Sequence, residues 1–207
     1  LIKHIARYGK PIILSTGMND LSTIKTAVEI FREYKVPYAL MHCTSMYPTP
    51  YDKVRLGAIT QMADTFADAV IGLSDHSIGN YACFASVALG ASILEKHFTL
   101  DNDLPGPDHW FSENPDGLKE WVSSIRTAHI MKGSPHVRPT RKELSNKKEF
   151  QRVVVAKRRI VKGDTLSSDN IYMQRVTGGN GLSPIFYDHL VATKARKDYK
   201  IGDPIEL

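Results

Sequence analysis

Four short apolar segments of this sequence each end in polar side chains that could carry out chemistry. These polar clusters are Ser15-Thr16-Gly17, His42-Cys43-Thr44-Ser45, Ser74-Asp75-His76 and Glu95-Lys96-His97. If the segments are parallel strands of a barrel, their carboxyl ends form one face, which is where such folds place their active sites. The spacing therefore predicts a single site built from the four clusters.

His76 and His97 follow two consecutive predicted strands. Neighbouring strands would bring both imidazoles to the same edge, and neutral imidazole suits divalent transition metals. Two protein ligands leave positions for water and substrate, which favours a catalytic ion. The alternative is a pair of unrelated polar histidines at the rim. His42 lies inside an apolar strand, which favours a hydrogen-bonded core histidine.

Serine and threonine hydroxyls at the strand ends, those of Ser15, Ser45 and Ser74 among them, would stand beside exposed backbone N–H groups. Such groups bind phosphate well, although serine and threonine also cap helices routinely. Asp108 lies in the rigid segment Leu104-Pro-Gly-Pro-Asp108 after the fourth strand. Its carboxylate could bind sugar hydroxyls or transfer a proton, or serve only as a turn residue.

The elements that must position these residues repeat one pattern up to about Gly133. Apolar runs at 11–15, 38–44, 69–74 and 92–98 are each followed by a helical segment. Three of the helices show apolar residues at i, i+3, i+4 and i+7 spacing. These stripes are Ile24, Ala27, Val28 and Phe31; Ile59, Met62, Ala63 and Phe66; Leu118, Trp121, Val122 and Ile125. Asp20 and Asn114 are predicted N-caps.

Strands that alternate with amphipathic helices indicate a parallel α/β sheet. Four such units are half of an eight-fold (β/α)₈ TIM barrel. An open doubly wound sheet is the alternative. No G-x-G-x-x-G sequence follows any of the strands, which argues against a dinucleotide site.

The remainder of the chain is predicted to form a second, smaller domain. We assign 1–133 to the half barrel, 134–149 to a proline-containing, highly charged linker and 150–207 to a turn-rich α+β domain. In the small domain, 153–156 and 159–161 are predicted strands, Ser168-Asp169 a helix cap, and Lys162-Gly-Asp and Lys200-Ile-Gly-Asp turns.

Composition narrows the classes of function. The chain has 207 residues, of which 42% are apolar and 24% charged, as in an ordinary globular protein. No apolar run is long enough for a membrane span, no signal peptide is recognisable, and two lone cysteines suit a reducing cytoplasm. Residues 1–133 hold 12 Lys and Arg against 14 Asp and Glu, whereas 134–207 hold 15 against 8. Stacking aromatics do not accompany these basic residues, so no nucleic-acid partner is expected.

Taken together, the motifs resemble the sialic acid synthase family. The resemblance runs through Leu14-Ser-Thr-Gly-Met18, His42-Cys-Thr-Ser-Met-Tyr-Pro-Thr-Pro-Tyr51, Ile71-Gly-Leu-Ser-Asp-His-Ser77, Leu94-Glu-Lys-His-Phe-Thr99 and Gly106-Pro-Asp108. From about Phe150 the chain resembles the family's antifreeze-like (SAF) domain, through Ser167-Ser-Asp-Asn170 and Arg175.

This resemblance implies roles for individual residues. His76 and His97 would bind a divalent ion, Mn²⁺ in the first place and Mg²⁺ or Co²⁺ as alternatives, and with Asp108 would be catalytic. Ser15, Ser45 and Ser74 would hold the phosphate of phosphoenolpyruvate. Tyr47 and Asp108 would face an N-acetylated amino sugar. Arg175 would reach that sugar's N-acetyl group from the other subunit of a domain-swapped homodimer.

The resemblance further implies condensation of phosphoenolpyruvate with N-acetylmannosamine and water to give N-acetylneuraminate and phosphate by C–O cleavage. A sibling synthase making legionaminic, pseudaminic or spore-coat sugars is one alternative. A non-catalytic carbohydrate-binding or dimerisation module is another. The first residues look like the end of a helix, so we expect a fragment, and the resemblance implies that the first four barrel units are absent from it. Such a fragment is expected to fold poorly and to be inactive alone, because sheet edges and apolar helix faces would be uncovered.

Overall fold

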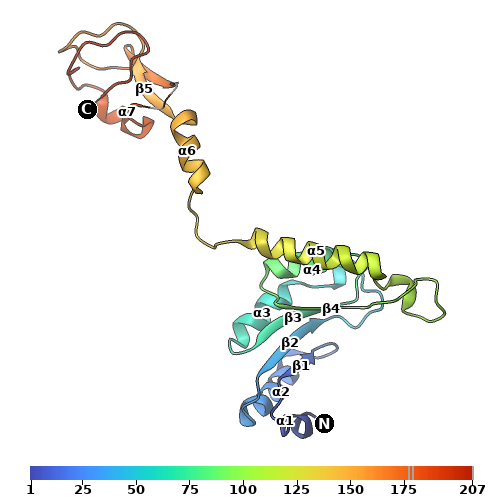
Figure 1. The fold of residues 1–207 in the computed structure, drawn as a ribbon. Helices are drawn as coiled ribbons and strands as arrows, with labels where there is room; N and C mark the ends of the chain where they lie inside the picture. Colours follow the sequence, from blue (N-terminus) through green and yellow to red (C-terminus); the bar gives the residue numbers. More distant parts are fainter. Residues whose placement is uncertain (177, 179, 207) are drawn as a thin grey trace. The chain divides into compact units, whose positions relative to one another are not determined.

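The computed structural model describes residues 1–176, 178 and 180–206, with only the backbone described at Lys148. The chain divides into two compact units, Leu1–Pro135 and His136–Leu207 (Figure 1). In the described part of the chain, no helix has the length and apolar character that a membrane crossing requires.

The first unit is built on a parallel sheet of four strands. These are β1 (Ile12–Ser15), β2 (Tyr38–Cys43), β3 (Val70–Asp75) and β4 (Ile93–Lys96), and each pairs with the next along the chain. A doubly wound sheet reverses its strand order at a switch point, whereas this order runs β1-β2-β3-β4 without reversal. The sheet is therefore a curled half barrel, as the sequence predicts (Figure 1).

Helices α2 (Leu21–Glu33), α3 (Gly57–Thr65), α4 (Tyr81–Ala88) and α5 (Pro115–Lys132) follow the four strands in turn, and the short α1 (Ile2–Ala6) precedes them. Both predicted caps are confirmed. The carboxylate of Asp20 accepts from the N–H of Thr23, and the side chain of Asn114 accepts from the N–H of Gly117. These caps satisfy N–H groups that a helix start leaves without partners.

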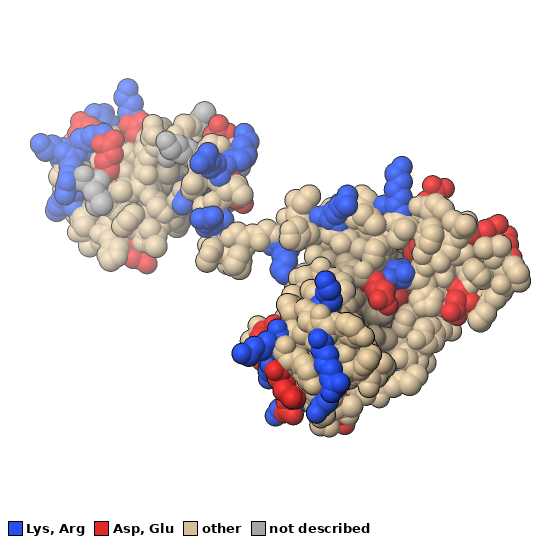
Figure 2. All heavy atoms as spheres, turned by 60° about the horizontal axis from the view of Figure 1, so that its bottom comes forward, with Lys and Arg blue, Asp and Glu red and all other residues tan. Residues whose placement is uncertain are grey.

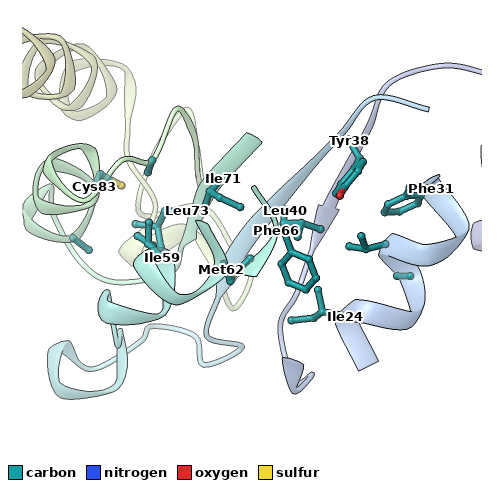
Figure 3. Close-up of a cluster of buried hydrophobic side chains, with 14 of the residues drawn as sticks. Ile24, Phe31, Tyr38, Leu40, Ile59, Met62, Phe66, Ile71, Leu73 and Cys83 are labelled. Atoms are coloured by element: carbon teal, nitrogen blue, oxygen red, sulfur yellow. The ribbon is translucent and has the colours of Figure 1, made fainter. Parts of the chain in front are cut away.

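The core of this unit lies between the sheet and its helices (Figure 3). Alternate strand residues such as Leu40, Ile71 and Leu73 point into it, where they meet Phe31 of α2 and Phe66 beyond α3. The opposite face of the sheet is less covered, and Ile13 of β1 is 60% exposed there. The predicted stripes are largely confirmed, but Ala63 is exposed, so its assignment to the buried face of α3 was wrong.

The second unit contains α6 (Arg141–Phe150), β5 (Arg152–Ala156), β6 (Ile171–Arg175) and α7 (Tyr187–Leu190). Strands β5 and β6 pair antiparallel. Its core is a separate apolar cluster that includes Val154, Ile160 and Tyr199. Lys and Arg outnumber Asp and Glu on the face of this smaller unit that is visible in Figure 2.

Several local predictions for this unit need correction. Helix α6 takes up the second part of the predicted linker and ends one residue beyond it, at Phe150, and it begins with a reciprocal capping box between Thr140 and Glu143. The segment 159–161 is no strand and forms only a bridge between Ile160 and Tyr199. The segment at 168–169 opens no helix, because the chain turns there and enters β6. The two predicted turns are confirmed, with positive φ at Gly163 and Gly202.

Candidate active site

The carboxyl ends of β3 and β4 bring His76 and His97 together. Their ring centroids are 5.1 Å apart with the rings nearly perpendicular. His76 is 6% exposed, and its Nδ1 lies 3.0 Å from the backbone oxygen of Thr44, which follows β2. Because that carbonyl can only accept, the neutral ring of His76 carries its proton on Nδ1 and keeps the lone pair on Nε2. Within the described residues, no hydrogen bond reaches Nε2 of either ring.

Aromatic rings enclose the two imidazoles. The ring of Tyr47 lies 4.3 Å from that of His76 and 5.8 Å from that of His97, centroid to centroid. The ring of Phe111 lies 5.1 Å from that of His97, centroid to centroid. Tyr47 itself is 53% exposed, so one face of this arrangement is open to a ligand.

The electrostatic environments of the two imidazoles differ. The Sγ of Cys43 lies 4.0 Å from Nδ1 of His76, and this contact raises the pKa of His76 and lowers that of Cys43. Burial and the nearby His76 both lower the pKa of His97. Since the contact with Thr44 is much shorter than that with Cys43, we assign the Nδ1 proton to the carbonyl of Thr44. A neutral His97 with a free nitrogen is a suitable metal ligand.

The residues present fit a divalent ion of the kind predicted. Metal-binding histidines usually donate their second ring N–H to a carbonyl or carboxylate, as His76 does to Thr44. On His97 the corresponding nitrogen lies 3.8 Å from the Oδ2 of Asp108. Among the described residues, no group of three or more His, Cys, Asp or Glu converges as a metal site. Water and substrate would therefore supply the remaining ligands, and the metal assignment stays a prediction.

The three serines predicted to bind phosphate lie on adjacent strand ends. Ser45 Oγ lies 3.9 Å from Cys43 Sγ, and the side chain of Ser15 also lowers the pKa of that thiol. Ser74 pairs in register with Cys43 and donates to Oε1 of Glu95 at 2.8 Å. The serines therefore surround Cys43 on the face of the sheet opposite the helices, and their role towards phosphate remains a prediction.

Gly17 explains how the first of these loops approaches the second. A Cβ at this position would collide with Ser45 Oγ and Cys43 Sγ. The glycine therefore permits the backbone after β1 to pack directly against the end of β2. His42, by contrast, points to the helix side, is 5% exposed and bonds the carbonyl of Val54 at 2.7 Å. It is the hydrogen-bonded core histidine that the sequence predicts.

Asp108 is placed by the loop that follows β4. Its side chain is 52% exposed beside His97. The loop is cross-linked by Asn102, whose amide donates to the carbonyls of His109 and Ser112, both at 2.8 Å. An exposed carboxylate on a rigid loop is available to a ligand, and its predicted catalytic and sugar-binding roles are untested.

Arg175 belongs to the second unit. It ends β6, its Nε donates to the carbonyl of Phe150, and its guanidinium stacks 5.4 Å from the centre of that ring. The guanidinium is exposed within this unit, and its contact with a sugar stays a prediction.

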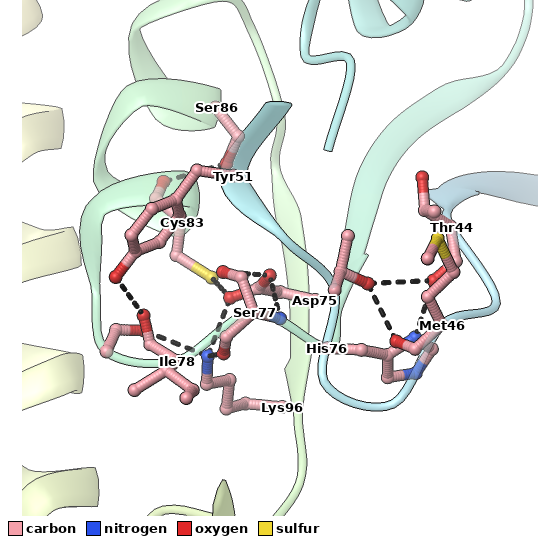
Figure 4. A network of polar contacts seen from close by, with 12 residues as sticks. Thr44, Met46, Tyr51, Asp75, His76, Ser77, Ile78, Cys83, Ser86 and Lys96 are labelled. Atoms are coloured by element: carbon pink, nitrogen blue, oxygen red, sulfur yellow. Dashed lines mark hydrogen bonds and ion pairs between the residues drawn. The ribbon is translucent and has the colours of Figure 1, made fainter. Parts of the chain in front are cut away.

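Sequence reasoning noted Asp75 and Lys96 only as polar strand ends and did not predict that they pair. Their side chains are 1% and 2% exposed, and Lys96 Nζ lies 2.7 Å from Asp75 Oδ2 (Figure 4). The signal in the sequence for this ion pair was one negative and one positive residue, each at the end of one of two consecutive strands. The register that places them opposite each other could not be read from the sequence.

Comparison with known proteins gives this geometry a family. Residues 1–137 match the model of the NeuB family, and residues 151–207 match that of the SAF domain. An uncharacterized protein of Methanocaldococcus jannaschii is 41% identical over 99% of the chain. The N,N'-diacetyllegionaminic acid synthase of Campylobacter jejuni is 37% identical over 96% of it. The chain spans 60% of the length of each of these two relatives.

A solved structure agrees with the fold described above. The N-acetylneuraminic acid (sialic acid) synthetase of Leptospira borgpetersenii, crystallised with citrate, superposes with a TM-score of 0.66 at 34% identity. The match covers 72% of this chain and 53% of that one.

Proposed function

The chain belongs to the NeuB family and carries an SAF domain, and on this premise we propose that the protein containing it is a phosphoenolpyruvate-dependent synthase of a nine-carbon sugar acid. The reaction joins C3 of phosphoenolpyruvate to the aldehyde carbon of an open-chain N-acetylated amino sugar. Water adds at C2, and phosphate leaves with cleavage of its C–O bond. Atoms balance as phosphoenolpyruvate, sugar and water giving the sugar acid and phosphate.

The observation that carries this proposal is the convergence of His76 and His97. Both imidazoles lie at the ends of adjacent strands, Nε2 of neither has a hydrogen-bond partner among the described residues, and Tyr47 covers the rings from one side. A purely structural scaffold has no use for two such nitrogens beside each other. A bound divalent ion would polarise the sugar's aldehyde oxygen, the Lewis-acid role of metals in carbonyl chemistry.

The other residues have roles that suit the same reaction. Ser15, Ser45 and Ser74 offer short hydroxyl donors on three adjacent strand ends, where they would orient the phosphate. Asp108, held by its loop beside His97, would bind a sugar hydroxyl or accept its proton. Arg175 of the SAF domain would contact the N-acetyl group, and we propose that it does so across a domain-swapped homodimer.

The identity of the sugar is the finer part of the proposal. N-acetylmannosamine, giving N-acetylneuraminate, is one candidate. A diacetamido hexose, giving a legionaminic-type acid, has equal support, because a Campylobacter jejuni relative is named for that product.

The test is phosphate release from phosphoenolpyruvate by the protein at its full natural length. Each sugar is assayed with Mn²⁺ and, in parallel, with EDTA. We expect metal-dependent release with one of the two sugars, and the faster one identifies the product. Release with neither of these sugars nor with any other N-acetylated amino sugar would contradict a synthase and favour a carbohydrate-binding or dimerisation module.

A further inference from the structure

The loop between β3 and α4, which begins with His76, is held through every one of its first four carbonyls. The oxygen of His76 accepts from the N–H of Thr49 at 2.8 Å. The oxygen of Ile78 accepts from the hydroxyl of Tyr51 at 3.0 Å. The oxygen of Ser77 accepts from the ammonium of Lys96 (Figure 4). The oxygen of Gly79 accepts from the same ammonium. A loop whose first four carbonyls are all bonded has little freedom to move.

Lys96 is the common partner in this arrangement. Its three N–H groups are used by Asp75 Oδ2 and by the carbonyls of Ser77 and Gly79. The carboxylate of Asp75 in turn accepts from the backbone N–H and the hydroxyl of Ser77 and from the thiol of Cys83. The ion pair thus joins the ends of β3 and β4 to the loop and to α4.

This cluster lies directly behind the two imidazoles. Asp75 and Lys96 are partners in the β3–β4 register, and His76 and His97 directly follow them in the sequence. Side chains alternate between the two faces of a strand. The ion pair therefore occupies the helix side of the sheet, whereas the imidazoles occupy the other side.

From this arrangement we propose that Lys96, through Asp75 and the carbonyls of Ser77 and Gly79, is a positioning residue that sets the orientation of His76 relative to His97 and thereby the affinity of the site for a divalent ion. The inference rests on the proposed function, because it takes the two histidines as metal ligands. Partners that orient metal ligands typically contribute ten- to a hundredfold to metal affinity.

A role in stability alone would behave differently. Replacing both members of a buried ion pair with well-packed apolar groups of similar volume is often neutral for stability, whereas removing one member leaves a buried charge and is strongly destabilising. The double variant Lys96→Met with Asp75→Asn removes both charges together. It also removes the hydrogen bonds from Lys96 to the carbonyls of Ser77 and Gly79. The variant therefore tests the positioning of the loop without leaving an isolated buried charge.

The experiment measures Mn²⁺ binding to the full-length protein by the electron paramagnetic resonance signal of free Mn²⁺, alongside thermal unfolding in EDTA. The matched control is Arg32→Met with Asp68→Asn, which removes a half-exposed ion pair elsewhere in the same unit. We expect the Lys96/Asp75 double variant to bind Mn²⁺ at least tenfold more weakly than the control while it still unfolds cooperatively.

Tyr51→Phe keeps the test open if the double variant fails to fold. Tyr51 is 60% exposed, so losing its hydroxyl removes the bond to Ile78 with little effect on folding, and severalfold weaker Mn²⁺ binding is expected. Unchanged affinity in the folded double variant, or in Tyr51→Phe if only that variant folds, would overturn the positioning role. Wild-type protein without Mn²⁺ affinity would overturn both this inference and the metal role in the proposed function.

Discussion

Replacing either His76 or His97 with alanine should weaken metal binding to a similar extent, but the two variants should differ in stability. In His76→Ala the lost hydrogen bond to Thr44 costs about 1 kcal/mol, and the loss of a buried ring costs roughly a further 1–2 kcal/mol. The side chain of His97 is 26% exposed and its Asp108 contact spans 3.8 Å, so His97→Ala should cost about 1 kcal/mol. We therefore expect His76→Ala to be less stable than His97→Ala by roughly 1–2 kcal/mol.

Urea unfolding of the full-length variants in EDTA measures this difference without any contribution from bound metal. Mn²⁺ titration and phosphate release, measured on the same samples, should show metal-dependent turnover abolished in both. The control His129→Ala, at an exposed position near the end of α5, should leave stability and metal binding unchanged. Equal losses of stability in the two site variants, or a larger loss in His97→Ala, would refute the reasoning from burial and hydrogen bonding.

Two further predictions concern the scaffold. Gly72→Ala should destabilise the protein by about 1–3 kcal/mol in urea unfolding, because a Cβ at this position of β3 would collide with the side chain of Met41 and with the backbone of β4. The control is Gly57→Ala in α3. Nothing lies within 4 Å of a Cβ at that position, so this variant should be neutral or stabilising. Asp20→Asn should remove one contribution to the pH dependence of stability. Hydrogen bonds from Thr23 lower the pKa of Asp20 below its ordinary value of 3.8. The stability that the Asp20 carboxylate contributes is therefore complete above that value and is lost as the pH falls through the lower, folded-state pKa. Asparagine caps without titrating, so an acid unfolding curve with unchanged slope would contradict this assignment.

The half barrel was predictable because its signals are local and repeated. Apolar runs and helices alternate four times, and the N-cap residues Asp20 and Asn114 mark the starts of two of the helices in the sequence. Helix α6 was missed because its charged residues give no apolar stripe, although the Thr140 and Glu143 pair that caps it has the spacing of a capping box. Ala63 was misplaced because alanine fits either face of a helix and i+4 spacing alone cannot decide its burial.

The candidate site was predictable only in part, since strand ends can be read from sequence but register cannot. The order of the strands was enough to bring His76 and His97 to one edge. The contact of Cys43 with His76, the bond from Ser74 to Glu95 and the ion pair of Asp75 with Lys96 all depend on which residues lie opposite each other. A shift of one residue would exchange the two faces of a strand.

Because the register decides on which face of the sheet each residue lies, polar residues can occupy both faces at the ends of β3 and β4. Along β3 and β4, Ser74 and Glu95 face away from the helices, Asp75 and Lys96 face towards them, and the histidines that follow return to the first side. Polar groups on the first side include the exposed Glu95 and the half-buried His97, together with the buried Ser74 and His76. Those on the helix side are buried, and a charge there is tolerated only when it is paired and hydrogen-bonded, as Asp75 and Lys96 are. The pair therefore makes a buried polar strand end stable, and the same bonds fix the loop that presents His76.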